Sequence, residues 1–164
     1  MTLNHMTLNH IALTVHIGLA LSLAALAGPA LAQVKAESPW VRGAVSGQLA
    51  TGAFLDITSA RDAALVKVES PIAAVAEMHA MEMKDTLMTM RAVSKIDLPA
   101  GKQVRLAPGG LHIMLMDLKQ PMKNGEMVPL KLTIEYADKK QEIVQVAAQV
   151  RGLGTSPPAQ HHHK

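Results

Sequence analysis

Two short sequence patterns each combine an imidazole with a thioether. Each is a histidine followed two positions later by a methionine: His-Ala-Met beginning at His79 and His-Ile-Met beginning at His112. In a β-strand, residues i and i+2 lie on the same face about 6.6–6.8 Å apart, so each pattern can present both groups side by side. Two such strands that lie close together could converge on one ion.

The chemistry of these side chains favours a soft, reduced metal ion. Thioether sulfur is soft and neutral and imidazole is borderline, a combination that selects Cu(I) over Mg²⁺, Ca²⁺ or Mn²⁺. Zinc prefers histidine, carboxylate or thiolate ligands, so a methionine-rich site serves it poorly. Thioethers need no deprotonation before they bind. The two patterns therefore favour Cu(I) and predict binding that persists under mildly acidic conditions.

Methionine is abundant and clustered in this chain, which leaves a second explanation open. Nine of the eleven methionines lie between Met78 and Met127, and the only histidines outside the two termini are His79 and His112. Methionines at alternating strand positions usually fill a hydrophobic core. Composition and spacing alone leave copper binding and core filling as alternatives. We expect core filling for four methionines: Met78, Met83, Met122 and Met127.

The composition of the 164 residues excludes several other classes of protein. Cysteine is absent, which excludes thiol catalysis, disulfides, iron–sulfur clusters and the blue-copper sites of electron-transfer cupredoxins. Aromatic residues make up 2%, too few for a base-stacking platform. The net charge of +3 is spread along the chain, so we expect no nucleic-acid partner. Hard ligands in an open set, or a carboxylate beside the histidines, are not evident, so we expect no enzyme.

The N-terminal segment has the features of an export signal. Residues 17–27 form an apolar run of eleven residues, whereas a bilayer span needs roughly 20. A Gly-Pro pair at 28–29 ends the run, and Ala-Leu-Ala at 30–32 supplies a cleavage pattern. No cysteine follows for lipid attachment. We therefore predict a signal peptide over 1–32 and a soluble periplasmic protein without a membrane span.

Alternation of apolar and polar residues dominates the rest of the chain and predicts β-strands. The clearest run is 128–136, in which every second residue is apolar. Turn signals such as Pro-Gly-Gly at 108–110 separate the runs. Residues 72–78 could form a single helical turn, but a strand is preferred there. The predicted strands are 52–59, 65–69, 75–83, 86–93, 102–106, 111–118, 128–136 and 141–150.

About eight short strands at regular spacing predict an all-β Greek-key β-sandwich. The length allows one core, so we expect a single domain over residues 33–151. Residues 152–164 have no apolar pattern and are predicted to form a flexible tail. The imidazoles of this tail suit Cu(II) at a possible second metal site, with a remnant of a purification tag as the alternative. They are His161, His162 and His163.

The histidines and methionines also form a longer pattern. His79 is followed after ten residues by Met90, and Met90 after twenty-one residues by His112 and then Met114. This H-x₁₀-M-x₂₁-H-x-M spacing, with the flanking sequences MHAMEM and PGGLHIMLMDLK, resembles the periplasmic copper chaperones of the PCu(A)C family. The resemblance covers roughly residues 38–147.

The resemblance implies a cupredoxin-like β-sandwich that binds one Cu(I) through four ligands: His79, Met90, His112 and Met114. It implies delivery of copper to the binuclear copper site of cytochrome c oxidase, alone or with a thiol-bearing co-chaperone. We expect a monomer. A periplasmic copper buffer for resistance would use the same site. Because a chaperone must release its ion, we expect a shallow site near the surface. The substitutes for a failed thioether ligand are Met81, Met88 and Met116.

Overall fold

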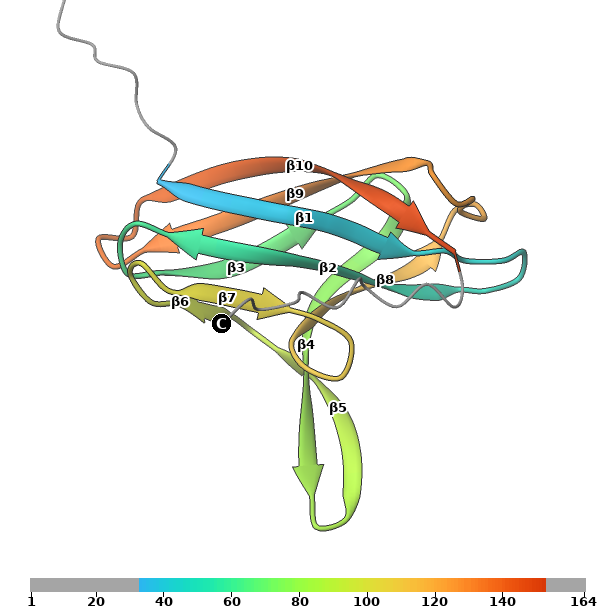
Figure 1. The fold of residues 1–164 in the computed structure, drawn as a ribbon, viewed down its shortest axis with the longest axis horizontal. Helices are drawn as coiled ribbons and strands as arrows, with labels where there is room; N and C mark the ends of the chain where they lie inside the picture. The colour runs from blue at the N-terminus through green and yellow to red at the C-terminus, as the bar shows by residue number, and fades with distance from the viewer. Residues whose placement is uncertain (1–32, 153–164) are drawn as a thin grey trace, which may run out of the picture. The chain divides into compact units, whose positions relative to one another are not determined.

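The computed structural model describes residues 33–152, and this part of the chain consists of strands and turns (Figure 1). Within these residues no helix is long and apolar enough to cross a membrane. The predicted signal peptide and the three histidines of the tail lie outside the described residues. The strands are β1 (Val34–Arg42), β2 (Ala50–Ser59), β3 (Ala63–Glu69), β4 (Ala73–Lys84), β5 (Leu87–Val93), β6 (Ile96–Leu98), β7 (Gln103–Leu106), β8 (His112–Leu118), β9 (Met127–Tyr136) and β10 (Gln141–Arg151).

The core forms where alternating apolar side chains of these strands meet. Every second residue of β9 from Val128 to Tyr136 is buried, and so are Ala53, Leu55 and Ile57 on β2. Burial of each large aliphatic side chain contributes roughly 1.5–3 kcal/mol. The alternation therefore selects strand structure and also decides which face of each strand points inward.

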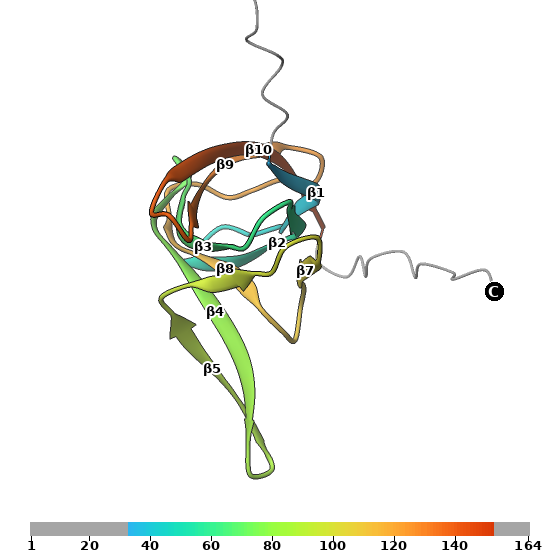
Figure 2. The same cartoon turned by 90° about the vertical axis from the view of Figure 1, so that its left-hand side faces the viewer.

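All the named strands belong to one hydrogen-bonded sheet that curves around this core (Figure 2). The strand order is β5-β4-β8-β2-β1-β10-β9-β3-β6, and β7 pairs with β2 off this path. β1 runs parallel to β10, while β2 pairs antiparallel with β8 and β3 with β9. Strands distant in sequence are thus neighbours, and the predicted all-β sandwich is confirmed.

The structure has ten strands in its described part rather than about eight. The two additional strands are β1 and β6, whose sequences do not show a clean alternation. In β1 the register shifts between Glu37 and Trp40, and Ser38 between them has φ 50°. Such a bulge accommodates the following proline, which cannot donate a ladder hydrogen bond. β6 has three residues, too few to show a period.

The β4–β5 hairpin extends beyond the rest of the sheet (Figures 1 and 2). Pairing of β4 with β8 ends at His79, which lies opposite His112. Pairing of β4 with β5 continues from Met78 to Lys84. β5 is therefore the sole paired strand beside the outer half of β4. The two histidines lie at the point where the hairpin leaves the sheet.

The core-filling prediction for four methionines is half correct. Met78 and Met122 are buried in the core, as expected. Met83 and Met127 are 64% and 57% exposed, so the prediction is wrong for them. Met83 lies on the part of the hairpin that has no opposing layer, and Met127 begins β9 opposite Gln149 near the end of β10. Alternation alone did not show where the opposing layer stops.

Candidate metal centre

The two histidines of the His-x-Met patterns are direct neighbours across β4 and β8. His79 lies opposite His112, and their ring centroids are 5.7 Å apart. Both residues are buried, with 8% and 6% of their surfaces exposed. Met78 and Ile113, their neighbours in sequence, point into the core. Because strand side chains alternate between faces, the two imidazoles lie together on the outer face of the sheet.

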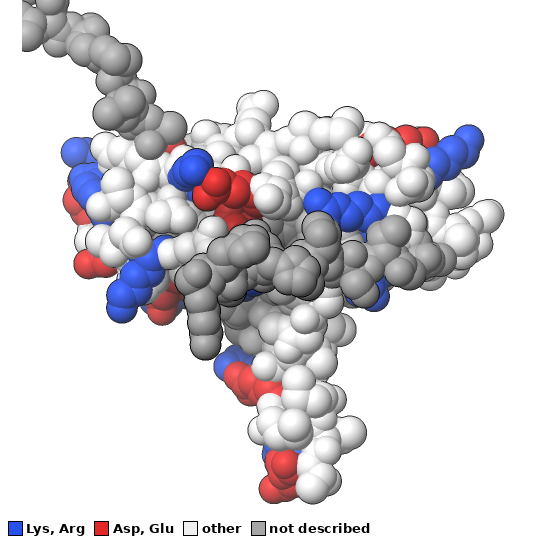
Figure 3. Space-filling view, viewed as in Figure 1, with Lys and Arg blue, Asp and Glu red and all other residues white. Residues whose placement is uncertain are grey.

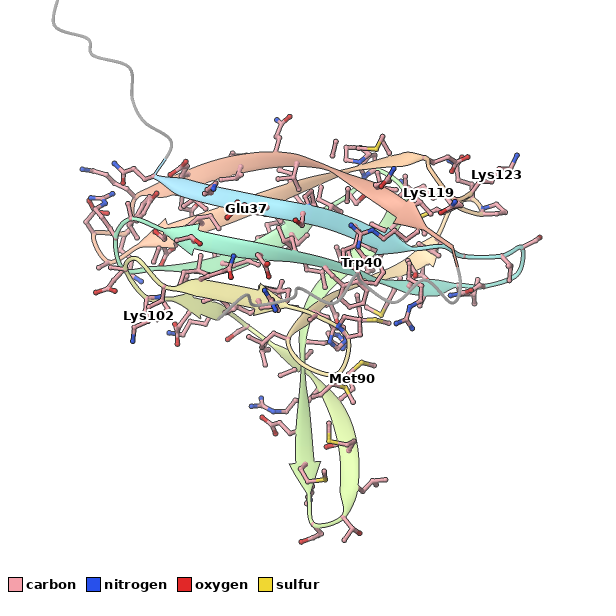
Figure 4. All side chains as sticks on the ribbon, in the orientation of Figure 1. Glu37, Trp40, Met90, Lys102, Lys119 and Lys123 are labelled. Carbon is pink, nitrogen blue, oxygen red and sulfur yellow. The ribbon has the colours of Figure 1, made fainter. Side chains whose placement is uncertain are left out.

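Thioethers from three strands lie beside the imidazoles. The sulfur of Met90, on β5, lies 3.1 Å from Nε2 of His112. Met90 lies opposite Met81 in the hairpin, and Met114 follows His112 on β8. Met81, Met90, His112 and Met114 all line one pocket. The structure thus brings the four predicted ligands together, with Met81 as a further thioether beside them. Figure 4 shows Met90 where the hairpin meets the sheet.

The other suggested substitutes lie further away along the strands. Met88 is opposite Met83, nearer the tip of the hairpin. Met116 is opposite Val75 on β4 and does not line the pocket. Of the three substitutes, Met81 is the one that shares the pocket of the predicted ligands.

His112 is oriented by the turn that precedes it. Its Nδ1 is 2.9 Å from the carbonyl oxygen of Gly110, which can only accept, so Nδ1–H is the donor. Nε2 therefore has its lone pair directed at the site. The turn is closed by a hydrogen bond from Gly110 N to Ala107 O and by the positive φ of 83° at Gly109, which glycine adopts without strain. The Pro-Gly-Gly signal thus marks the turn that orients a predicted ligand.

In His79 the ring nitrogen left for a metal ion is Nδ1, whereas in His112 it is Nε2. Its Nε2 lies 2.9 Å from a carboxylate oxygen of Glu77 and donates to it. Its Nδ1 is buried and has no hydrogen-bond partner among the described residues. A buried ring nitrogen without a partner is costly unless something else satisfies it. Nδ1 of His79 and Nε2 of His112 are therefore the two nitrogens free to bind an ion.

Glu77 is a neighbour of the candidate site that the sequence analysis missed. The expectation that no carboxylate lies beside the histidines is wrong. Glu77 precedes His79 by two positions on β4, so the period of a strand places both on one face, and Glu77 lies opposite Met114. A carboxylate that accepts from a ligating imidazole fixes its tautomer and orientation. The i, i+2 spacing was the signal available for finding it.

An aromatic side chain closes one side of the site. The ring of Phe54 lies over Gly52, so that a Cβ on Gly52 would be 2.6 Å from Cζ of Phe54. Gly52 is opposite Met114, and the centroid of Phe54 is 6.4 Å from that of His112. Trp40 contacts Phe54, with ring centroids 4.4 Å apart and the ring planes tilted by 32°. Because Gly52 has no side chain, the ring of Phe54 can lie over it and form an apolar wall beside the imidazole of His112.

The site is accessible from its methionine side. Met90 is 49% exposed, and Met81 and Met114 are half-buried, whereas both imidazoles are buried. This geometry agrees with the expected shallow site. No group of three or more His, Cys, Asp or Glu side chains in residues 33–152 is arranged to hold a metal ion. The donors gathered here are two imidazoles and several thioethers, which is a set for a soft ion.

The fold is that of PCuAC domains. A solved structure described as "Copper-bound PCuAC domain from PmoF2" is 23% identical with a TM-score of 0.61, covering 74% of this chain and 95% of that one. The "apo PmoF2 PCuAC domain" is 24% identical with a TM-score of 0.59, covering 74% and 91%. "Solution structure of apo-DR1885 from Deinococcus radiodurans" is 23% identical with a TM-score of 0.54, covering 92% and 95%. These likenesses establish the fold.

The chain belongs to the LpqE-like family, whose sequence model, described as "Putative lipoprotein LpqE-like", matches residues 34–150. A curated relative, "Putative lipoprotein Lxx21020" of Leifsonia xyli subsp. xyli (strain CTCB07), is 37% identical over 108 residues. That match covers 64% of this chain and 63% of the relative. Family and fold together confirm the resemblance to the PCu(A)C family.

Proposed function

We propose that this protein binds one Cu(I) through four side chains and carries it to a copper-accepting protein. The four are His79, Met90, His112 and Met114. The observation that carries the proposal is the buried Nδ1 of His79, which has no hydrogen-bond partner among the described residues, near Nε2 of His112, which lies 3.1 Å from the sulfur of Met90. The solved structure described as a copper-bound PCuAC domain supports copper as the metal.

The ligand set favours the reduced ion. Two thioethers and two imidazoles are neutral, and soft sulfur favours Cu(I). The one carboxylate nearby, from Glu77, is engaged with the ring of His79. It therefore does not replace a soft ligand, and the preference for Cu(I) rests on the two thioethers.

The accessibility of the site favours transfer over storage in a closed cavity. The exposed Met90 can be displaced by a ligand of an acceptor while the buried histidines still hold the ion. A stepwise exchange of this kind avoids release of free copper. We infer a carrier, with no catalytic step.

The proposed acceptor is the binuclear copper site of cytochrome c oxidase, reached directly or through a thiol-bearing co-chaperone. A periplasmic copper buffer with the same site is the alternative. The test is transfer: Cu(I)-loaded protein is mixed with the apo copper domain of the oxidase, and the metal on each is measured after separation. Movement of copper supports the chaperone. Retention of copper by this protein, with binding intact, supports the buffer.

We further propose export as a monomer to the periplasm after removal of residues 1–32. The match to a family described as lipoproteins supports export. Cleavage is tested by sequencing the N-terminus of the protein recovered from the periplasm. A mature chain that begins elsewhere than residue 33 would contradict the predicted cleavage site.

The tail is proposed to capture Cu(II) through His161, His162 and His163. Imidazole nitrogen suits Cu(II) and must be neutral to bind, so capture should weaken as the pH falls below about 6.5. Deletion of residues 161–164 should lower the Cu(II) stoichiometry and leave the Cu(I) affinity unchanged. Unchanged Cu(II) binding would exclude a metal role for the tail.

A further inference from the structure

We propose a second, weaker Cu(I) site on the β4–β5 hairpin, formed by the thioethers of Met83 and Met88 with Met81 and joined to the histidine centre by Met90, through which the ion enters and leaves that centre. The inference rests on the proposed function of that centre. It concerns methionines beyond the predicted four-ligand set, because Met83 and Met88 take no part in the pocket beside His112.

The strand register places the four thioethers on one face. Met81 lies directly opposite Met90, and Met83 directly opposite Met88. Directly opposed residues of an antiparallel pair share a face, with Cβ atoms about 4.5–5.5 Å apart. Along each strand the two methionines are about 6.6–6.8 Å apart. These spacings allow flexible methionine side chains to bring sulfur atoms from both strands to one ion.

The opposite face of the hairpin is polar. It carries Glu82 and Arg91, which form an ion pair of 2.6 Å, and Thr89, which lies opposite Glu82. Figure 3 shows the charged side chains of the hairpin on one side and at the tip, with an uncharged surface between. The hairpin is therefore two-faced, although neither face of its outer half covers a core.

Core filling does not explain these methionines. Met83 is 64% exposed, Met88 45% and Met90 49%. Beyond His79 the hairpin has no pairing with β8, and the exposure of these side chains shows that no described layer covers its outer half. Figure 4 shows sulfur atoms along the hairpin, from Met90 near the sheet outward. An exposed row of one soft donor type, with no charge on its face, matches the preference of Cu(I) for thioether ligands.

The row is continuous with the histidine centre. Met81 and Met90 belong both to the row and to the pocket of His112 and Met114. An ion held by Met83 and Met88 is thus one cross-strand pair away from the centre. Two imidazoles bind more strongly than thioethers alone, so the ion moves inward when the centre is empty. An acceptor meets the ion at the outer pair.

The test is a titration of the full chain, labelled with ¹³C at the methionine methyl groups, using Ag(I) as a redox-inert probe and then Cu(I). The first equivalent should shift the methyl signals of Met90 and Met114. The second should shift those of Met83 and Met88. The double variant Met83→Leu/Met88→Leu should keep the first response unchanged and bind no further ion on the hairpin. The matched control Met127→Leu replaces a methionine of similar exposure on β9 and should keep both responses.

The outcomes separate this inference from the proposed function. If the first equivalent leaves Met90 and Met114 unshifted, the proposed copper centre fails. If the first equivalent binds there and Met83 and Met88 never shift, the hairpin site is overturned and the centre stands. A third outcome is that Met83 and Met88 of the parent chain never bind metal, yet the double variant transfers copper more slowly to the acceptor. This outcome assigns the hairpin to protein docking and also overturns the metal site.

Discussion

The same side chain has different roles in two regions of this molecule. Met78 and Met122 are buried in the core, where their thioethers fill space among aliphatic neighbours. Met83 and Met88 are exposed on a hairpin that has left the sheet. Met78 and Met83 belong to one strand and differ in whether an opposing layer covers them. A methionine thus serves as packing or as an available soft ligand according to its surroundings, and its own chemistry does not decide which.

The largest expected effect is the loss of a core methionine. Met122→Ala should lower the free energy of unfolding by about 2–5 kcal/mol, because it removes buried atoms and leaves a cavity. Cu(I) affinity should be unchanged. Chemical denaturation measures the stability. Met83→Ala on the exposed hairpin is the control and should change stability by less than about 0.5 kcal/mol. Equal losses in the two variants would refute the contrast between the regions.

The next effect is on copper and leaves the fold intact. Met90→Leu should weaken Cu(I) binding about 100-fold, or about 2.7 kcal/mol, because the volume is kept and the sulfur is lost. Stability should change by less than about 1.5 kcal/mol. Competition against a Cu(I) chelator measures the affinity, and Met114→Leu should behave similarly. Parental affinity in both variants would disprove the ligand assignment, and Met81 would be the first substitute to test.

A smaller effect is expected at the carboxylate that orients His79. Glu77→Ala should weaken Cu(I) binding about tenfold, since partners of ligating histidines typically contribute 10–100-fold. Glu77→Gln keeps an oxygen that accepts from Nε2 and should restore part of the affinity. The ¹⁵N shifts of the His79 ring should report a mixture of tautomers in the alanine variant.

Glu82→Ala is the matched control for this prediction. Glu82 lies on the other face of the same strand and pairs with Arg91, so its loss should leave Cu(I) affinity and the His79 tautomer unchanged. If Glu77→Ala also leaves both unchanged, the carboxylate has no positioning role.

The last effect appears only at alkaline pH and concerns a residue in the core part of β9. Burial, together with a hydrogen bond to Glu142, raises the pKa of Tyr136 on β9 to about 12. The folded state therefore favours the protonated phenol, and its contribution to stability is complete below pH 10 and is lost as the pH rises towards 12. The free energy of unfolding should fall across this window, and Tyr136→Phe should flatten that fall. A parental profile in the variant would contradict the assignment.

Much of the fold could be predicted from the sequence because it depends on local pattern. Alternating runs such as 128–136, and turn signals such as Pro-Gly-Gly at 108–110, depend on residues that are close in sequence. They predicted eight of the strands and the turn before His112. The types and spacing of the histidines and methionines indicated a soft-metal site. β1 was missed because its bulge breaks the alternation.

The tertiary structure alone decided which of these residues meet. The register that places His79 opposite His112, and the end of β4–β8 pairing at that pair, arise from contacts between strands far apart in sequence. They set the free nitrogen of each imidazole, the approach of Met90 to His112 and the exposure of Met83. Local sequence carries the period of a strand, but long-range pairing sets its partner and where the pairing stops. For that reason the residues suited to bind copper and a site near the surface could be predicted from the sequence, while the pairing of the two histidines and the methionine-lined hairpin beyond them could not.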